Sequence, residues 1–324
     1  MTKKIELLDQ VRQIIRTKNY MYKTEVSYID WIYRFIMFHN NKHPKDIREK
    51  EISEFLTFLA VKRKVSASTQ YQALNALTFL YKEVLKIQLK DFSFKHSKVG
   101  ERVPVVLSRN EVKMVLSDLR GEAWLMASLL YGCGLKLAEC LKLRVKDVDF
   151  DLNEIVVTNG KGDNDHRTIF PVLLKDQIKL RINNTKIILN NNLLIKGFNG
   201  VLMPEALERK YPNAPKELAW QYLFPSRKPT IDPLSGELKQ HHRDESFLQK
   251  AVKTAVKKVG ITKNAGCYTF RHSFAIHLLE DGYCIQIVQK LLSHKNIRTT
   301  KKYTHILNQH KPNVRSPIDS LNLE

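Results

Sequence analysis

Residues 267–274 read CYTFRHSF and place an Arg-His pair at the start of an apolar, helix-like segment. The spacing of the apolar residues predicts a helix over about 271–281. Arg271 could be an ordinary surface charge of that helix. Its planar guanidinium is also the side chain best suited to hold a phosphate through two hydrogen bonds. The stretch therefore raises two questions: whether Arg271 binds a phosphate, and what Tyr268, three residues earlier, does beside it.

The composition of the chain is strongly basic. Its 324 residues include 54 Lys+Arg and 33 Asp+Glu, which give a formal net charge of +21. Nucleic acid is the partner that this charge favours, because neutralising phosphates releases condensed counterions. An anionic membrane surface is the weaker alternative. The length and the 43% hydrophobic content are sufficient for about two domains.

Neither a targeting segment nor a membrane segment is recognisable. The N-terminal MTKKIELLDQ lacks the apolar core of a signal peptide, and no run approaches the roughly 18 uninterrupted apolar residues of a membrane helix. We therefore expect a cytoplasmic protein. The cysteines have no CxxC spacing and lie in helix-like apolar surroundings, which predicts buried free thiols and no metal site. They are Cys133, Cys140, Cys267 and Cys284.

Helical spacing of apolar residues dominates the first part of the chain. It predicts four helices, near 4–17, 22–39, 46–63 and 67–87. The period is lost over 91–107, a basic stretch that contains a proline. We therefore expect an N-terminal four-helix domain over 1–90, followed by a linker over 91–107.

A second domain is expected over 108–324. Ser108 and Glu111 have the spacing of a capping box, which predicts a helix start there. Further helices are expected near 122–132, 137–143, 245–259, 284–292 and 297–307. A β-branched run at 155–157, the turn-rich GKGDND and the extended 167–170 predict a small β-hairpin. The proline-rich segment at about 190–244 is interpreted as an insertion with one short helix near 204–210, so the chain is mainly α with a small β-hairpin.

Four side chains of the second domain suit the cleavage of a phosphodiester without a metal. Such a reaction needs cations on the nonbridging oxygens, a nucleophile in line and an acid for the leaving oxygen. Arg271 and His272 at a helix start, together with His294 and Tyr303, could supply several of these parts. Arg271, His294 and Tyr303 each have an ordinary structural explanation as well: a surface charge, a helix-ending cap and a half-buried aromatic that packs beside Ile306.

Taken together, three segments resemble the conserved boxes of tyrosine recombinases of the phage-integrase and Xer types. They are LLYGCGLKLAECLKLRVKDVDF, GCYTFRHSFAIHLLEDG and LLSHKNIRTTKKYTHI. In addition, ALERKYPNAPKELAWQYLFPS and QHHRDE resemble the extra segment of integron integrases, which recombine gene cassettes. The resemblance implies an N-terminal SAM-like core-binding domain and a C-terminal catalytic domain that enclose DNA as a clamp. It also implies four protomers on two DNA sites, and no cofactor.

The resemblance assigns roles to four residues whose types match the family. Tyr303 matches the nucleophile that joins a 3′ phosphate, Arg271 the second clamp arginine and His294 the histidine of the third box. Lys161, in GKG, matches the lysine of the hairpin, which would protonate the departing 5′ oxygen. Alone, Lys161 would be interpreted as a solvated loop charge.

Two positions depart from the family pattern. Lys136 stands where the first clamp arginine is expected, and it replaces a rigid fork by a flexible point charge. Tyr268 stands where a histidine is expected. A tyrosine can donate its hydroxyl to a phosphate oxygen, but it does not carry a proton at neutral pH as imidazole does. Both changes predict weaker catalysis.

The extra segment contains four candidates for contact with DNA. Integron integrases recognise a folded single strand by its extruded bases, and aromatic or imidazole faces can stack such bases. The candidates are Trp220, Pro233, His241 and His242. Trp220 could equally anchor the insertion on the domain core, and no cysteine or carboxylate near the two histidines in sequence completes a metal site. The segment at about 308–324 resembles the family's C-terminal tail, and from sequence it could equally be a frayed end.

Three functions follow from these observations. The first is an integron-type tyrosine recombinase with reduced activity. The second is a DNA-binding protein that keeps the clamp but no longer cuts DNA, which Lys136 and Tyr268 favour. The third, a basic architectural or RNA-binding protein, predicts equal affinity for hairpins with and without extruded bases.

Overall fold

The computed structural model describes residues 2–97, 104–158 and 165–310. By its internal contacts the chain divides into two compact units, Met1–Arg102 and Val103–Glu324. Both are mainly helical, and the second unit also contains two small sheets, so the predicted fold class is confirmed. Within the described residues, every helix is too short or too polar to cross a membrane.

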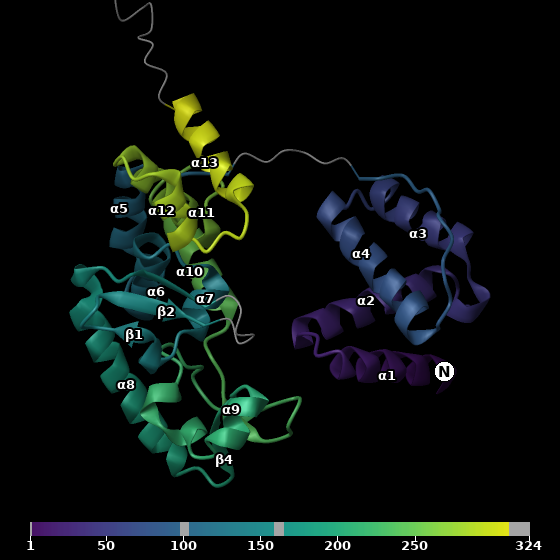
Figure 1. Ribbon diagram of the computed structural model, residues 1–324, viewed down its shortest axis with the longest axis horizontal. Helices are drawn as coiled ribbons and strands as arrows, with labels where there is room; N and C mark the ends of the chain where they lie inside the picture. Colours follow the sequence, from purple (N-terminus) through teal and green to yellow (C-terminus); the bar gives the residue numbers. More distant parts are fainter. Residues whose placement is uncertain (1, 98–103, 159–164, 311–324) are drawn as a thin grey trace, which may run out of the picture. The chain divides into compact units, whose positions relative to one another are not determined.

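The first unit is a bundle of helices around an apolar core (Figure 1). The fourth predicted helix, 67–87, is in fact an α-helix that continues as one turn of π-helix. Large side chains that are almost fully buried, such as Phe35 and Phe55, lie at the centre of this core. The elements are α1 (Thr2–Thr17), α2 (Tyr22–Phe38), η1 (Pro44–Asp46), α3 (Glu49–Val61), α4 (Ala67–Phe79) and the π-helix η2 (Leu80–Val84).

Two buried polar side chains fasten extended segments to this bundle. The hydroxyl of Tyr81 donates to the carbonyl of Pro44 at 3.0 Å. The amide of Gln70 donates to the carbonyl of Lys95 at 2.8 Å, and its oxygen accepts from the backbone N–H of Ser97 at 2.9 Å. Buried polar groups need such partners, so residues up to Ser97 are held on the first unit.

The second unit is built around α6, most of whose residues are buried. Its first helix starts as predicted: the Ser108 hydroxyl accepts from the N–H of Glu111 at 3.2 Å, and the Glu111 carboxylate accepts from the N–H of Ser108 at 2.7 Å. The helix at 267–280 begins four residues before the predicted start. The helices are α5 (Arg109–Asp118), α6 (Gly121–Gly132), α7 (Leu137–Lys142), α10 (Glu245–Lys258), α11 (Cys267–Glu280), α12 (Ile285–Leu291) and α13 (Ile297–His310).

The predicted hairpin is part of a three-stranded antiparallel sheet. After η3 (Val145–Asp147), the strands β1 (Val148–Asp149), β2 (Glu154–Val157) and β3 (His166–Ile169) pair in the order β1-β2-β3. Ile155 pairs with Val148 on one side and with Thr168 on the other. The segment 159–164, which contains Lys161 and most of GKGDND, predicted as a turn, lies outside the described residues.

The longest helix of the chain, α8 (Lys175–Leu193), follows η4 (Val172–Leu174) and was not predicted from the sequence. The reason is that its buried face is largely polar. Arg181, Thr185 and Asn192 are buried there; Arg181 donates to the Leu223 carbonyl at 2.8 Å, and Asn192 donates to Gln240 at 2.8 Å. Polar side chains on the inward face mask the apolar periodicity on which the prediction depends.

The insertion contains a second small sheet, which the sequence did not predict either. Here β4 (Phe198–Val201) pairs in parallel with β6 (Leu238–Gln240), and β5 (Thr230–Ile231) pairs with β6 on the other side. The short helix α9 (Glu205–Lys210) agrees with the prediction. Two 3-10 turns follow α9, η5 (Ala214–Lys216) and η6 (Leu218–Trp220).

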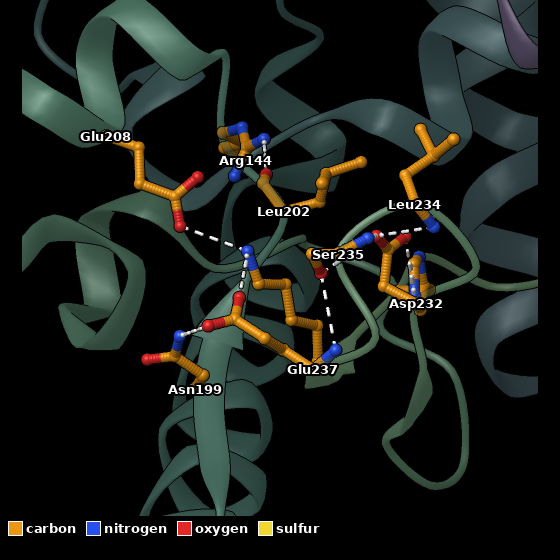
Figure 2. Close-up of polar contacts among 10 residues, drawn as sticks. Arg144, Asn199, Leu202, Glu208, Asp232, Leu234, Ser235 and Glu237 are labelled. Atoms are coloured by element: carbon orange, nitrogen blue, oxygen red, sulfur yellow. Dashed lines mark hydrogen bonds and ion pairs between the residues drawn. The ribbon is translucent and has the colours of Figure 1, made fainter. Parts of the chain in front are cut away.

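A buried lysine on β6 forms ion pairs that connect the sheet of the insertion to α9. The amino group of Lys239, on β6, lies 3.0 Å from a carboxylate oxygen of Glu208 on α9 and 2.9 Å from one of Glu237 (Figure 2). Asn199, on β4, donates to the other oxygen of Glu237 at 2.7 Å. The Lys239 side chain is 3% exposed, so its charge is stabilised by these two carboxylates rather than by water.

Candidate active site

Tyr303 is buried in the middle of α13. It is 4% exposed, and its ring belongs to an apolar cluster that includes Phe274, Leu292 and Ile306. The Tyr303 hydroxyl lies 2.8 Å from Nδ1 of His272, on α11. Burial raises the pKa of Tyr303 above its usual value, although the charge of Arg271 acts in the opposite direction. The hydroxyl is therefore protonated at neutral pH.

Arg271 is 2% exposed, so the interpretation of this residue as a surface charge is wrong. Its guanidinium donates to the carbonyl of Leu292 at 2.6 Å and to the carbonyl of Gly134 at 2.5 Å. The carboxylate of Glu139 lies 3.6 Å away. Burial lowers the pKa of Arg271, and the nearby charge of Glu139 only partly offsets this decrease. A guanidinium nevertheless stays charged in proteins. The site thus holds a fixed, buried positive charge.

His294 follows α12 and contacts both Arg271 and Tyr303. Its Nε2 lies 3.4 Å from the Arg271 guanidinium, and its Nδ1 lies 2.9 Å from the hydroxyl of Thr300. The His294 and Tyr303 rings are stacked, with centroids 6.3 Å apart and planes 16° apart. Because arginine only donates, Nε2 is the acceptor and the proton resides on Nδ1. Burial, followed by the charges of Arg271 and Lys136, lowers the pKa of His294 to about 4.

Lys136 lies at the N-terminus of α7 and is bound to a carboxylate of the same helix. Its Nζ lies 2.6 Å from Oε1 of Glu139, and its backbone N–H donates to Oε2 at 2.8 Å. Burial acts to raise the pKa of Glu139, but Lys136 and Arg271 outweigh it and leave the pKa lowered. Glu139 is therefore an ionised carboxylate between the two cations. The Lys136 side chain is 39% exposed, so its ammonium is accessible to a ligand.

Two predicted residues of the site remain, Tyr268 and Lys161, and the structure describes only the first of them. Tyr268 is 57% exposed, and its ring centroid lies 6.0 Å from that of His272. Lys161 lies outside the described residues. Around Arg271 the structure thus brings together Lys136, His294 and Tyr303, with Tyr268 at the exposed edge.

Sequence reasoning missed two partners within this site. Glu139 follows Lys136 at capping-box spacing, which is a local signal, but nothing in the sequence places it beside Arg271. Thr300, which is fully buried and bonded to His294, carries no such signal. The sequence offered His272 beside Arg271 as a candidate without a specific role, and its bond to a tyrosine 31 residues later follows from how α11 and α13 pack.

The four candidates in the insertion form two local groups. Trp220 and Tyr222 flank the guanidinium of Arg144, which lies 5.8 Å and 4.7 Å from their ring centroids, and the His242 ring meets Tyr222 edge-on at 5.5 Å. Lys146 also lies over the Trp220 ring, at 4.6 Å.

The other two candidates lie beside a buried aspartate. Nε2 of His241 lies 3.8 Å from Asp232, and the exposed Pro233 follows Asp232 directly in the chain. Figure 2 shows Asp232 accepting from Ser235 and Leu234. Burial raises the pKa of Asp232, but these hydrogen bonds outweigh burial and keep its pKa below the usual range. Asp232 therefore stays ionised and fixes the turn that presents Pro233.

The cysteines are free, and three of them are buried as predicted. The prediction for Cys284 is wrong. Cys284 is exposed because it precedes α12, as the residue that begins the helix, rather than packing within it. Among the described residues, no group of three His, Cys, Asp or Glu side chains is placed to hold a metal ion.

Comparison with known proteins identifies the family. Residues 7–91 match the family described as "Phage integrase, N-terminal SAM-like domain", and residues 106–310 match the "Phage integrase family". An integrase/recombinase of Escherichia coli is 42% identical over 318 residues, which cover 98% of this chain and 94% of that protein. The tyrosine recombinase XerA of Pyrococcus horikoshii is 30% identical over 276 residues, covering 83% and 79%. The chain belongs to the phage integrase family.

Solved structures share the fold. A transposon integrase in complex with transposon right end DNA aligns with a TM-score of 0.61 at 16% identity, over 97% of this chain and 96% of that one. The XerH site-specific recombinase bound to palindromic difH substrate aligns with a TM-score of 0.58 at 19% identity, over 96% and 87%.

Proposed function

We propose that this protein is a site-specific DNA recombinase of the tyrosine class, which cuts and rejoins DNA through a 3′-phosphotyrosine intermediate. The observation that carries the proposal is the convergence of three side chains at one place in the second unit. The Tyr303 ring stacks on His294, and His294 contacts the buried guanidinium of Arg271. A fixed cation beside a tyrosine stabilises the charge that develops on a phosphate when the tyrosine oxygen attacks it.

In the proposed reaction, Arg271 and Lys136 bind the nonbridging oxygens of the scissile phosphate. His294, whose Nε2 accepts from Arg271 in the DNA-free protein, joins them as a donor once the bound phosphate has replaced that contact and Nε2 carries a proton. Charge accumulates on these oxygens in the transition state, and fixed donors stabilise it more than they stabilise the ground state. The Tyr303 oxygen attacks phosphorus, and Lys161 protonates the departing 5′ oxygen. The 5′ hydroxyl of a second strand then attacks the phosphotyrosine, which restores the diester without a metal or an external energy source.

We assign the protein to the integron type, which recombines gene cassettes and recognises folded single-stranded sites by their extruded bases. The insertion supports this assignment, because the Trp220 ring lies beside the cations of Arg144 and Lys146, and the His242 ring meets Tyr222 edge-on in the same group. Flat rings beside cations suit an unstacked base and its phosphate. As in the family it resembles, four protomers would act on two DNA sites.

A second function is favoured by one observation. The ammonium of Lys136 is already paired with Glu139, so it offers a phosphate less than a free arginine fork would. A protein of this kind could bind DNA through the same surfaces and leave it uncut. The formal net charge of +21 serves both functions.

Covalent trapping distinguishes the two functions. The purified protein is incubated with a nicked, bulged hairpin that carries a cassette site, in which the nick lets the 5′ fragment diffuse away after cleavage. A recombinase forms a protein–DNA adduct that survives denaturation and is absent with Tyr303→Phe. Tight, bulge-dependent binding without an adduct would establish the DNA-binding function instead. Equal binding of hairpins with and without bulges, again without adduct, would contradict both.

A further inference from the structure

We propose that His272 is a further catalytic residue of this site, which takes the hydroxyl proton of Tyr303 as the phosphotyrosine bond forms. The inference rests on the proposed recombinase function and extends it by naming the group that activates the nucleophile. The observation behind it is the 2.8 Å hydrogen bond between Nδ1 of His272 and the hydroxyl of Tyr303. Among the described residues, this is the hydrogen bond that the Tyr303 hydroxyl makes.

The nucleophile needs a proton acceptor. A phenol has an unperturbed pKa of about 10, and burial raises the pKa of Tyr303 further. The position at which the family has a histidine holds Tyr268, which is exposed and is itself a phenol. His294 stacks face to face on Tyr303, while its two nitrogens are directed at Arg271 and Thr300. His272 is thus the imidazole whose nitrogen meets the attacking oxygen.

His272 is in the protonation state that this role requires. Burial, followed by the charge of Arg271, lowers its pKa to about 4, so the ring is neutral at pH 7. With Nδ1 accepting from Tyr303, the ring proton lies on Nε2. A phosphate bound next to Arg271 offsets part of the positive charge that lowers this pKa, so substrate binding makes His272 a stronger base. The titratable and charged groups around it are Tyr268, Arg271, Tyr303 and His294. Lys136 and Glu139 act on His294, and Glu139 also lies beside Arg271.

The proton and bond changes balance. The bond between the Tyr303 oxygen and phosphorus forms, the bond between phosphorus and the 5′ oxygen breaks, and the tyrosine proton moves to Nδ1 of His272. The 5′ oxygen takes a different proton, from the acid proposed above. On rejoining, the 5′ hydroxyl returns its proton to that acid, and the released tyrosine oxygen recovers its proton from His272. No oxidant, metal or cofactor is needed.

The test compares two replacements in the full-length protein. His272→Asn places an amide near the position of Nδ1, which keeps a hydrogen bond to Tyr303 but does not take a proton; His272→Phe removes both. The matched control is His277→Asn, on the same helix, where Nδ1 of His277 forms an equivalent 2.9 Å bond to the Tyr131 hydroxyl. Single-turnover adduct formation on the nicked, bulged hairpin is measured from pH 5.5 to 9, and hairpin binding at wild-type affinity identifies the folded variants.

We expect both His272 variants to form the adduct about 100-fold more slowly or worse, as for the loss of a general base, while His277→Asn keeps the wild-type rate. The rate of His272→Asn should then rise with pH throughout, because hydroxide must remove the proton. An Asn variant with the wild-type rate and pH profile would overturn the inference, since a hydrogen bond alone would then suffice.

A substrate with sulfur in place of the bridging 5′ oxygen provides the second measurement. A thiolate leaves without protonation, so this substrate should not restore the rate of His272→Asn. Restoration would overturn the inference, because His272 would then act on the leaving group. A wild-type protein that forms no Tyr303-dependent adduct would instead overturn the recombinase function itself, and this inference with it, which is a distinct result.

Discussion

The ammonium of Lys136 lies 2.6 Å from Oε1 of Glu139, and the other oxygen of the same carboxylate lies 3.6 Å from the guanidinium of Arg271. One buried carboxylate therefore holds both proposed phosphate-binding cations. In the DNA-free protein it offsets their mutual repulsion. A phosphate that binds Lys136 must compete with Glu139 for a single ammonium group. The planar guanidinium of an arginine could instead bind Glu139 through one edge and the phosphate through the other.

Lys136→Arg combined with Tyr268→His should therefore increase cleavage. Because the loss of one fixed donor to a developing oxyanion costs about 100–1000-fold in rate, we expect the double variant to form the Tyr303 adduct about 10-fold faster or more. Single-turnover trapping measures it. The matched control is Lys142→Arg, an exposed lysine at the end of the same helix, which should change nothing. An unchanged rate in the double variant would mean that the two departures do not limit the chemistry.

Arg271→Lys should reduce both activity and stability. The guanidinium is 2% exposed and donates to the carbonyls of Gly134 and Leu292. A lysine cannot reach both carbonyls in the same plane, and each unsatisfied buried group costs about 1–3 kcal/mol. We expect a lower midpoint of urea unfolding and an adduct rate at least about 100-fold lower. Arg109→Lys, at an exposed ion pair with Asp281, is the control and should leave both nearly unchanged.

How far the sequence predicts this structure depends on where the apolar side chains lie. Helices with an apolar stripe, such as α2 and α13, were predicted within a few residues, and Ser108 with Glu111 fixed the start of α5. The helix α8 was missed because Arg181, Thr185 and Asn192 occupy its buried face. Strands of two or three residues, as in the insertion, are too short to show a period at all.

The sequence predicts the proposed site as a set of residue types but not as a geometry. The order and spacing of the boxes selected Arg271, His294 and Tyr303, and the structure places them in contact. The contacts that tune them depend on tertiary packing between elements far apart in sequence. The bond from His272 to Tyr303 and the approach of Glu139 to Arg271 are of this kind.

Stability should fall as the pH falls from about 6.5 to about 4. The folded-state pKa of both His272 and His294 is about 4, below the ordinary value of 6.5. The unfolded chain therefore binds more protons in this window, so the stabilisation is complete above pH 6.5 and is lost towards pH 4. Allowing for the partial exposure of both rings, we expect the free energy of unfolding to decrease by on the order of 2 kcal/mol over this pH range.

Urea unfolding at several pH values measures this effect. In a Trp31→Phe background the remaining tryptophans, Trp124 and Trp220, lie in the second unit, so fluorescence reports on that unit alone. Carboxylates titrate in every variant, so the absolute pH dependence is not informative. The informative quantity is the difference in the free energy of unfolding between His272→Asn and its parent, which should become smaller as the pH falls. His43→Gln, in the first unit, is the control. A difference that stays constant from pH 7 to pH 4.5 would contradict the buried, neutral state of His272.

The insertion supplies the last prediction, which separates the two interpretations of Trp220. If the Trp220 ring stacks an extruded base, Trp220→Ala should weaken binding to the bulged hairpin by about 1–3 kcal/mol and leave the affinity for a hairpin without bulges unchanged. If the ring instead anchors the insertion through Arg144 and Lys146, the variant should lose affinity for both hairpins and unfold at lower urea. Tyr211→Ala, an exposed ring in the same insertion, is the matched control. Equal losses on both hairpins would remove Trp220 from the proposed base-recognition surface, whereas a bulge-specific loss at unchanged stability would support contact between the ring and the extruded base, because the stacked base is present in only one of the two hairpins.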